Sequence, residues 1–204
     1  MSLKEHIKDV SVELFARNGI RRVSMNDVAQ KANVSKRTLY EFFSDKESLL
    51  IAVLNMLREP FFEYIESLEK KHYTALDVLL LFNEKLMERP SWICEDFFED
   101  IKRYPNASRL LTGSKSIFLN KIIELLRRGV REDVFMSDVN YDILSLLFHE
   151  RTSKREPSGI FAKYTNEEVH NTFFFILLRG ICTDTGRDVL DRFLVKKRYE
   201  HDNV

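Results

Sequence analysis

Long apolar runs are missing from this sequence, as are internal repeats and a glycine-rich phosphate loop. The longest apolar blocks, Val78 to Phe82 and Thr172 to Leu178, are far too short to cross a bilayer as a helix. The N-terminal stretch MSLKEHIKDV contains charges and lacks the apolar core of a secretion signal. We therefore expect a cytoplasmic protein that does not associate with a membrane.

The sequence also has few cysteines and a formal net charge of zero. The two cysteines, Cys94 and Cys182, are too few and too far apart for a disulfide framework or a metal-binding spacing. Each is interpreted as a small buried residue in a reducing compartment, with a redox-sensing thiol as the alternative. Lys and Arg together number 32, as do Asp and Glu, so bulk charge does not indicate a nucleic-acid partner. Any DNA affinity must come from the local placement of cations.

Helical periodicity dominates the chain instead. Leu3, Ile7, Val10 and Leu14 follow one helical face, and Asn18-Gly19 is expected to end that helix. Capping boxes predict helix starts at Ser24/Asp27, Ser44/Glu47, Thr74/Asp77 and Thr165/Glu168. Further helices are expected from Glu47 with a bend or break at Pro60, and over 91–103, 107–128, 138–151 and 166–183, with a loop over 151–159. The sequence predicts an all-α fold.

The segment from Met25 to Ser44 has the pattern of a helix-turn-helix. Ala29 stands where two short helices touch and only a small side chain fits, and Asn33 stands at the turn, where a left-handed backbone is expected. The apolar residues that would clamp the helices together are Val28, Ala32, Val34, Leu39 and Phe42. This combination predicts DNA binding.

The second motif helix, expected over Lys36 to Phe43 after a cap at Ser35, begins with Lys36, Arg37 and Thr38. A recognition helix enters the major groove with its N-terminal residues foremost, where donors reach base edges and phosphates. Two cations and a hydroxyl suit that role. The alternative is a solvated basic turn between two ordinary helices.

Residues Leu3 to Leu50 resemble the DNA-binding domain of the tetracycline-repressor-like (TetR) family of bacterial regulators. The matching positions are Phe15, Gly19, Ser24, Val28, Ala29, Val34, Ser35, Thr38, Leu39, Tyr40, Phe43, Lys46 and Leu49. The resemblance implies a three-helix DNA-binding domain over residues 1–46, followed by a larger helical effector-binding and dimerisation domain over 47–204. It implies no cofactor and no catalytic residue.

The resemblance also assigns a DNA-contacting set. Its members lie at the start of each motif helix and of the helix that follows: Ser24, Met25, Asn26, Ser35, Lys36, Arg37, Thr38, Tyr40 and Lys46. Asn33 replaces the glycine usual in the family, which is a mild change. Phe42 stands where the family often has His, so one phosphate contact is lost and Tyr40 and Lys46 carry more of the anchoring. Glu41 is expected to face a neighbouring helix or to repel wrong sequences.

The body is rich in aromatic residues, with 16 Phe, 7 Tyr and 1 Trp in the whole chain. Core packing explains most of them. The alternative is an effector pocket, and the resemblance points to Phe82, Trp92, Phe97, Phe98, Phe118 and Phe148 as its lining. Four acidic residues, Glu95, Asp96, Glu99 and Asp100, would favour a cationic amphipathic ligand, or else form a solvated helix face. The sequence does not identify the effector.

Dimerisation is expected because one short recognition helix reads too few bases to be selective, so two copies read a near-palindrome. The family pairs through its last two long helices, which implies an interface of Leu144, Leu147, Phe174, Leu177, Leu178 and Ile181. Burial of these side chains within one chain is the alternative.

The sequence therefore predicts a ligand-responsive regulator, most often a repressor in this family, that binds a palindromic operator as a homodimer. A DNA-binding regulator without a small-molecule effector is the first alternative. The second is a helical-bundle metalloenzyme, because Glu69-x-x-His72 and Glu167-x-x-His170 have the spacing of di-iron carboxylate sites. Both pairs are expected to face solvent, which argues against the enzyme.

Overall fold

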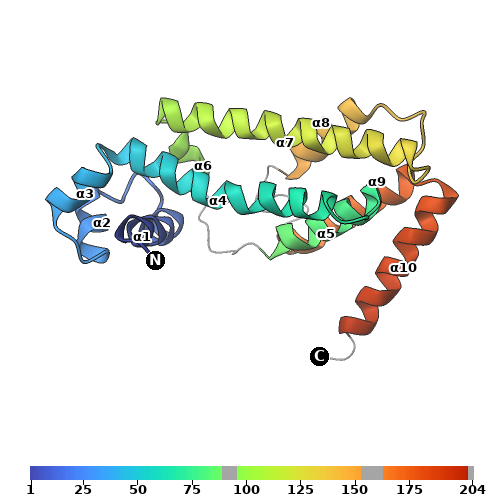
Figure 1. Ribbon diagram of the computed structural model, residues 1–204, viewed down its shortest axis with the longest axis horizontal. Coiled ribbons are helices and arrows are strands. Elements are labelled where there is room, and N and C mark those ends of the chain that lie inside the picture. The colour runs from blue at the N-terminus through green and yellow to red at the C-terminus, as the bar shows by residue number, and fades with distance from the viewer. Residues whose placement is uncertain (89–95, 153–162, 202–204) are drawn as a thin grey trace. The chain divides into compact units, whose positions relative to one another are not determined.

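The computed structural model describes residues 1–88, 96–152 and 163–201, and helices dominate those ranges (Figure 1). The helices are α1 (Leu3–Asn18), α2 (Met25–Lys31), α3 (Lys36–Phe42), α4 (Lys46–Glu69), α5 (Ala75–Met87), α6 (Asp96–Ile101), α7 (Pro105–Arg131), α8 (Tyr141–Thr152), α9 (Asn166–Ile181) and α10 (Asp184–His201). An isolated antiparallel bridge joins Phe135 and Cys182. The all-α prediction is confirmed, and none of the described helices is long and apolar enough to span a membrane.

The chain divides into two compact units, which are described separately. The first comprises residues 1–64 and 89–116, and the second comprises residues 65–88 and 117–204. Helices α4 and α7 contribute residues to both units. The division expected between residues 46 and 47 separates a DNA-binding head from a body by function, and it stays a prediction.

In the first unit, α1, α2 and α3 share one apolar core. Ile7 and Phe15 of α1 are fully buried in it with Leu39 of α3. A capping box between Ser2 and Glu5 begins α1. The predicted end of α1 is confirmed, because Gly19 has a φ of 78° and donates its N–H to the carbonyl of Phe15 at 3.0 Å.

The same core continues into α4, α6 and the start of α7. Its members from these helices are Leu49, Leu50, Val53, Leu54, Phe97, Ile101 and Ala107. The three-helix head therefore does not close its apolar core alone. Helices far along the chain complete it, and this fixes the surface that the head presents.

The capping box predicted at Ser44 and Glu47 is wrong by one residue. Helix α4 begins at Lys46, and Asp45 accepts the N–H of Ser48 on its Oδ1 at 2.7 Å. The Ser48 hydroxyl accepts the N–H of Asp45 at 3.2 Å in return. Asp caps a helix as well as Ser does, so local propensity could not choose between the two positions. The carboxylate of Glu47 binds elsewhere, as described below.

Other helix boundaries follow the sequence with specific corrections. Pro60 does not interrupt α4, and α7 begins at Pro105 rather than Ala107, because a proline in the first turn loses only an N–H that would have no helical partner. Helix α7 also continues past Gly129 to Arg131. The predicted helices over 138–151 and 166–183 are shorter, as Tyr141–Thr152 and Asn166–Ile181, and α10 was not predicted at all. The first residues of the helix expected over 91–103 and most of the loop expected over 151–159 lie outside the described ranges.

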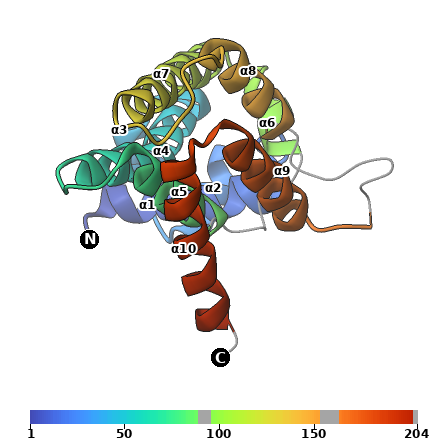
Figure 2. The same ribbon diagram turned by 90° about the vertical axis from the view of Figure 1, so that its right-hand side faces the viewer.

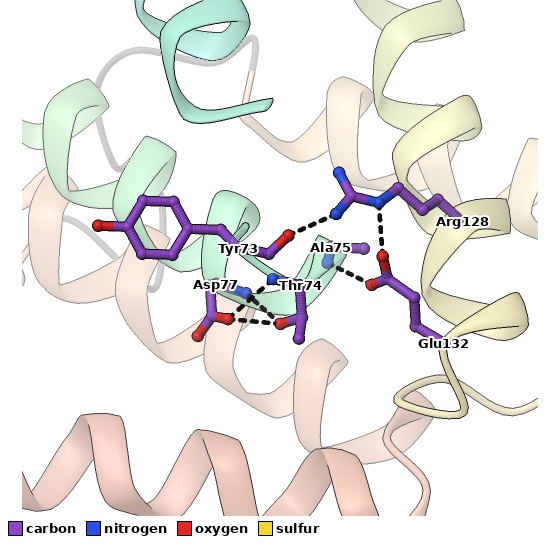
Figure 3. A network of polar contacts seen from close by, with 6 residues as sticks. All are labelled: Tyr73, Thr74, Ala75, Asp77, Arg128 and Glu132. Atoms are coloured by element: carbon purple, nitrogen blue, oxygen red, sulfur yellow. Dashed lines mark hydrogen bonds and ion pairs between the residues drawn. The ribbon is translucent and has the colours of Figure 1, made fainter. Parts of the chain in front are cut away.

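In the second unit, the start of α5 is held by Arg128 of α7 and by Glu132, which directly follows α7 (Figure 3). Thr74 and Asp77 form the predicted capping box. Glu132 accepts the N–H of Ala75 at 2.6 Å and also pairs with Arg128, whose Nη2 donates to the carbonyl of Tyr73. The contact from Glu132 satisfies an N–H that a helix start leaves without a helical acceptor.

Figure 2 shows the ribbons of α8, α9 and α10 in this unit. Aromatic and amide side chains contribute to the packing of its helices. The ring centroid of Phe148 on α8 lies 6.0 Å from the ring centroids of Phe173 and Phe174 on α9. Asn83 of α5 is buried, and its Oδ1 lies 2.8 Å from Nε2 of His170. The predicted Thr165/Glu168 box begins α9, and α10 lies against α5.

Candidate nucleic-acid interface

The turn between α2 and α3 has the geometry that the sequence predicts. Asn33 adopts a φ of 54°, in the left-handed region that Asn tolerates better than most residues. The N–H of Val34 binds the carbonyl of Ala29 at 2.9 Å, which brings the start of α3 against α2. Ala29 is buried at this crossing, where a larger side chain would push the helices apart. One clamping residue was wrong: Phe42 is 39% exposed, while its neighbour Phe43 is buried.

Helix α3 presents a basic, hydroxyl-bearing N-terminus. Ser35 is the N-cap, and its hydroxyl accepts the N–H of Thr38 at 3.0 Å. The hydroxyls of Ser35 and Thr38 lie 2.8 Å apart. Lys36 and Arg37 are exposed, and the first turn of α3 contains no acidic residue. This end of the helix can donate hydrogen bonds to phosphates or base edges.

Arg37 is paired within its own helix. Its Nε lies 3.1 Å from Oε1 of Glu41, one turn later, and the two side chains are 90% and 60% exposed. Such an exposed pair contributes little to stability, about 0.3–0.5 kcal/mol, so it yields readily to a stronger acceptor. Glu41 therefore orients Arg37 in the absence of DNA, a contact that the sequence analysis did not anticipate.

At the start of α2, the predicted box is present. Ser24 accepts the N–H of Asp27 at 3.2 Å, and Asp27 accepts from both the N–H and the hydroxyl of Ser24. These hydrogen bonds from Ser24 lower the pKa of Asp27. Asn26 is exposed, whereas Met25 is buried in the core of the head. A DNA contact from Met25 would therefore have to come from its backbone N–H.

Lys46 and Tyr40, the two expected phosphate anchors, differ in their surroundings. Tyr40 is 43% exposed on α3. Lys46 is partly buried in the first turn of α4, where its Nζ donates to the carbonyl of Arg21 at 3.5 Å and lies 6.0 Å from the ring centre of Phe15. Burial lowers the pKa of Lys46, and the negative charges of Asp100 and Asp27 oppose that shift.

The predicted effector-pocket residues fall into separate groups. Phe97 is buried in the core of the first unit, where its ring contacts Phe98 with a centroid distance of 5.0 Å. In the second unit, the rings of Phe82 and Phe118 lie 5.5 Å apart, and Phe148 packs on α9. Trp92 lies outside the described residues. None of the five described residues among them lines a pocket of 360 Å³ formed by Val130, Asp133, Phe135, Met136, Ser137, Asp138 and Thr183.

The acidic residues near Phe97 have structural partners. Asp100 is buried and accepts the N–H of Arg21 on its Oδ2 at 2.7 Å. Glu99 is exposed and pairs at 2.7 Å with Lys102, which directly follows α6. Glu95 and the side chain of Asp96 lie outside the described part of the chain. The two acidic side chains seen here are thus a core carboxylate and a solvated one.

The predicted dimer residues divide into buried and exposed ones. Phe174, Leu178 and Ile181 are buried within the chain itself, whereas Leu147 is 54% exposed and Leu144 and Leu177 are intermediate. Sequence reasoning missed three strongly exposed apolar side chains on the same two helices, Ile143, Leu146 and Ile176. Their exposure could not be read from the sequence, because helical periodicity does not tell which apolar positions of α8 and α9 the other helices cover.

The metal and thiol alternatives gain no support from the described residues. No group of three or more His, Cys, Asp or Glu side chains in them could hold a metal ion. Glu69 pairs with Lys121 at 2.8 Å, Glu167 is exposed, and His170 contacts Asn83. Cys182 is buried, and burial raises its pKa to about 11, so the unreactive thiol form dominates at neutral pH. Cys94 lies outside the described residues.

Comparison with known proteins finds similarity to bacterial transcription regulators. Residues 7–53 match the family described as "Bacterial regulatory proteins, tetR family". QacR, an HTH-type transcriptional regulator of Staphylococcus aureus, is 31% identical over 84 residues, which cover 41% of this chain and 45% of QacR. The fatty acid metabolism regulator protein of Bacillus subtilis is 33% identical over 79 residues, covering 39% of this chain and 41% of that protein. The chain thus matches less than half the length of these curated relatives.

The likeness in fold extends further than the likeness in sequence. The crystal structure of a TetR-family transcriptional regulator from Agrobacterium tumefaciens matches with a TM-score of 0.72 and 16% sequence identity, covering 89% of this chain and 98% of that one. At this identity, the match shows a shared fold for head and body.

Proposed function

This chain belongs, through residues 7–53, to the tetR family of bacterial regulatory proteins, and on that basis we propose that it regulates transcription by binding a near-palindromic DNA operator as a homodimer. We propose regulation and not catalysis as its activity, since the matched family is described as one of bacterial regulatory proteins and QacR is a transcriptional regulator. We propose that it acts as a repressor and that repression is relieved when a small molecule binds the helical domain that follows the DNA-binding head.

The observation that carries the DNA-binding proposal is the start of α3. Lys36 and Arg37 are exposed there beside the Ser35 and Thr38 hydroxyls, on a helix that the Asn33 turn sets against α2. Arg37 suits a bidentate contact to guanine, and Lys36 suits a base edge or a phosphate. Because the first turn of α3 lacks an acid, nothing in it repels the backbone of DNA.

The first prediction separates base contacts from phosphate contacts. Arg37→Ala or Lys36→Ala should reduce discrimination between a selected duplex and random duplex by about 1–3 kcal/mol, because a base contact is lost. Lys46→Ala and Tyr40→Phe should weaken binding to both duplexes about equally, because a phosphate contact carries no sequence information. The measurement is fluorescence anisotropy, using a duplex selected from a randomised pool.

The control is Arg192→Ala, which removes the same charge from an exposed position of α10 and should change neither affinity. A Lys46→Ala variant with altered base preference and unchanged affinity for random duplex would contradict the assignment of roles.

Dimerisation through α8 and α9 is supported by the exposed apolar side chains on these helices. Ile143, Leu146 and Leu147 lie three and four residues apart on one face of α8, and Ile176 is 63% exposed on α9. One turn after Ile176 comes Gly180, where a Cβ would meet no atom within 4 Å. A second copy would cover these side chains, and the glycine would allow its backbone to approach closely.

For the effector, we propose a small apolar or amphipathic molecule bound among aromatic side chains of the body, with Phe82, Phe118 and Phe148 as candidates. Helix α4 begins three residues after Phe43, and we propose that it connects the effector site to the recognition helix. A tilt of α4 would move α3 relative to α3 of the second copy. Two recognition helices must match a spacing of about 34–36 Å on DNA, so a small tilt opposes binding.

The second prediction follows from linkage. A compound found by its ability to raise the melting temperature should weaken operator binding, and operator DNA should weaken binding of that compound by the same factor, typically about 5–150-fold. Calorimetric titration of the compound with and without operator measures both. Equal compound affinity in the two titrations would favour a regulator without a small-molecule effector.

A further inference from the structure

The turn between α1 and α2 is held at one residue, Arg21, through both its N–H and its carbonyl. The N–H of Arg21 donates to Oδ2 of Asp100 on α6 at 2.7 Å, and the carbonyl of Arg21 accepts from Nζ of Lys46 on α4 at 3.5 Å. Both contacts use the backbone of Arg21, whose side chain is exposed. The turn is therefore fixed from outside the three-helix head, and Ser24, the cap of α2, follows three residues later.

Asp100 is placed for this contact by the core. It is 8% exposed, and its neighbours Phe97 and Ile101 on α6 are buried in the same apolar cluster as Ile7 and Phe15. A buried carboxylate is costly without donors or a nearby cation, and Asp100 has the Arg21 N–H and the Lys46 ammonium. Tyr104 also lies close: burial raises its pKa, and the charges of Asp100 and Glu47 raise it further.

Glu47, next to Lys46 in the first turn of α4, binds a different helix. Its Oε1 accepts the N–H groups of Asn106 and Ala107 at 2.6 and 3.2 Å, and its Oε2 accepts from the side-chain amide of Asn106 at 3.2 Å. These amides belong to the first turn of α7, which has no helical acceptors for them. A carboxylate at a helix N-terminus is favoured by the helix dipole as well.

We propose that Asp100 and Glu47 are positioning residues for DNA reading. From α6, Asp100 sets the turn that leads to Ser24, and Glu47 ties the first turn of α4, which carries Lys46, to the start of α7. Ser24 and Lys46 are two of the candidate phosphate contacts, so the two carboxylates set the distance between phosphate-binding groups. This inference rests on the proposed DNA binding and adds the residues that tune it.

The test compares carboxylate variants in the full-length protein. Asp100→Ala and Glu47→Ala should each weaken binding to selected and random duplexes about equally, by tenfold or more, with base preference unchanged. Asp100→Asn and Glu47→Gln should recover most of that loss, because an amide oxygen still accepts from the same N–H groups. Glu99→Ala is the matched control on α6, since Glu99 is exposed and pairs with Lys102, and it should bind as the wild type does.

Stability is measured in parallel, because each alanine substitution also removes hydrogen bonds that hold the fold. Thermal unfolding by circular dichroism sets a temperature at which every variant is folded, and duplex binding is compared there by anisotropy. Hydrogen exchange at residues 20–24 should rise in Asp100→Ala and not in Glu99→Ala. A folded Asp100→Ala variant that binds both duplexes within twofold of wild type would overturn the positioning role alone. A wild-type protein that selects no duplex would overturn the proposed function as well.

Discussion

Introducing glutamate at both Leu146 and Ile176 is expected to convert a dimer into a monomer and to abolish operator binding. The two side chains are 59% and 63% exposed on α8 and α9 of the single chain, so the charges cost little in a monomer. In an interface, each would be buried without a partner, at a cost of about 3–5 kcal/mol. Size-exclusion chromatography with light scattering measures the mass, and anisotropy measures duplex binding.

Two comparisons make this result specific. Val195→Glu places the same charge on an exposed apolar position of α10, 50% exposed, and should leave the dimer intact. Phe174→Glu should instead unfold the body, because Phe174 is buried within its own chain between Phe148 and Phe175. A stable dimer from the Leu146→Glu, Ile176→Glu double variant would place the interface elsewhere.

Enlarging Ala29 to leucine is expected to abolish DNA binding while leaving the dimer intact. Ala29 is 3% exposed where α2 meets the start of α3, and its carbonyl accepts the N–H of Val34. A leucine there has to displace one helix, because overpacking a filled core costs about 1–3 kcal/mol. The displacement would move Lys36 and Arg37 away from the geometry that reads DNA.

The matched control is Gln30→Leu, which introduces the same side chain at the next residue of α2, where it is exposed. This variant should bind the selected duplex as the wild type does. Anisotropy gives the affinities, and light scattering checks that both variants remain dimeric. Normal duplex affinity in Ala29→Leu would mean that the packing of α2 on α3 does not set the reading geometry.

The motif itself could be predicted from sequence because its determinants are local. Asn33 adopts the predicted left-handed conformation, Ser24 and Ser35 cap the predicted helices, and Gly19 ends α1. Each of these depends on residues within four positions along the chain, where backbone sterics and capping dominate. The exposed cations at the start of α3 follow from the same local register.

Errors arose where two local solutions have similar energy. Asp45 and Ser44 are both good caps, and the choice of Asp45 coincides with the engagement of Glu47 by the first turn of α7. Helix α10 carries many charges and lies against α5, so its sequence alone gave little signal. In both cases the observed element is accompanied by a contact with a helix distant in sequence, which local patterns do not record.

By itself, the sequence determined the helical class, the helix-turn-helix and the cap and cations at the start of α3, since these depend on local backbone preference and on a short apolar register. Only the tertiary structure decided which side chains of α8 and α9 remain exposed, such as Ile176, and which are buried, such as Phe174. It also decided that the carboxylate of Asp100 accepts the N–H of Arg21 in the turn between α1 and α2. Burial and long-range hydrogen bonds join residues tens of positions apart, so no local pattern records them.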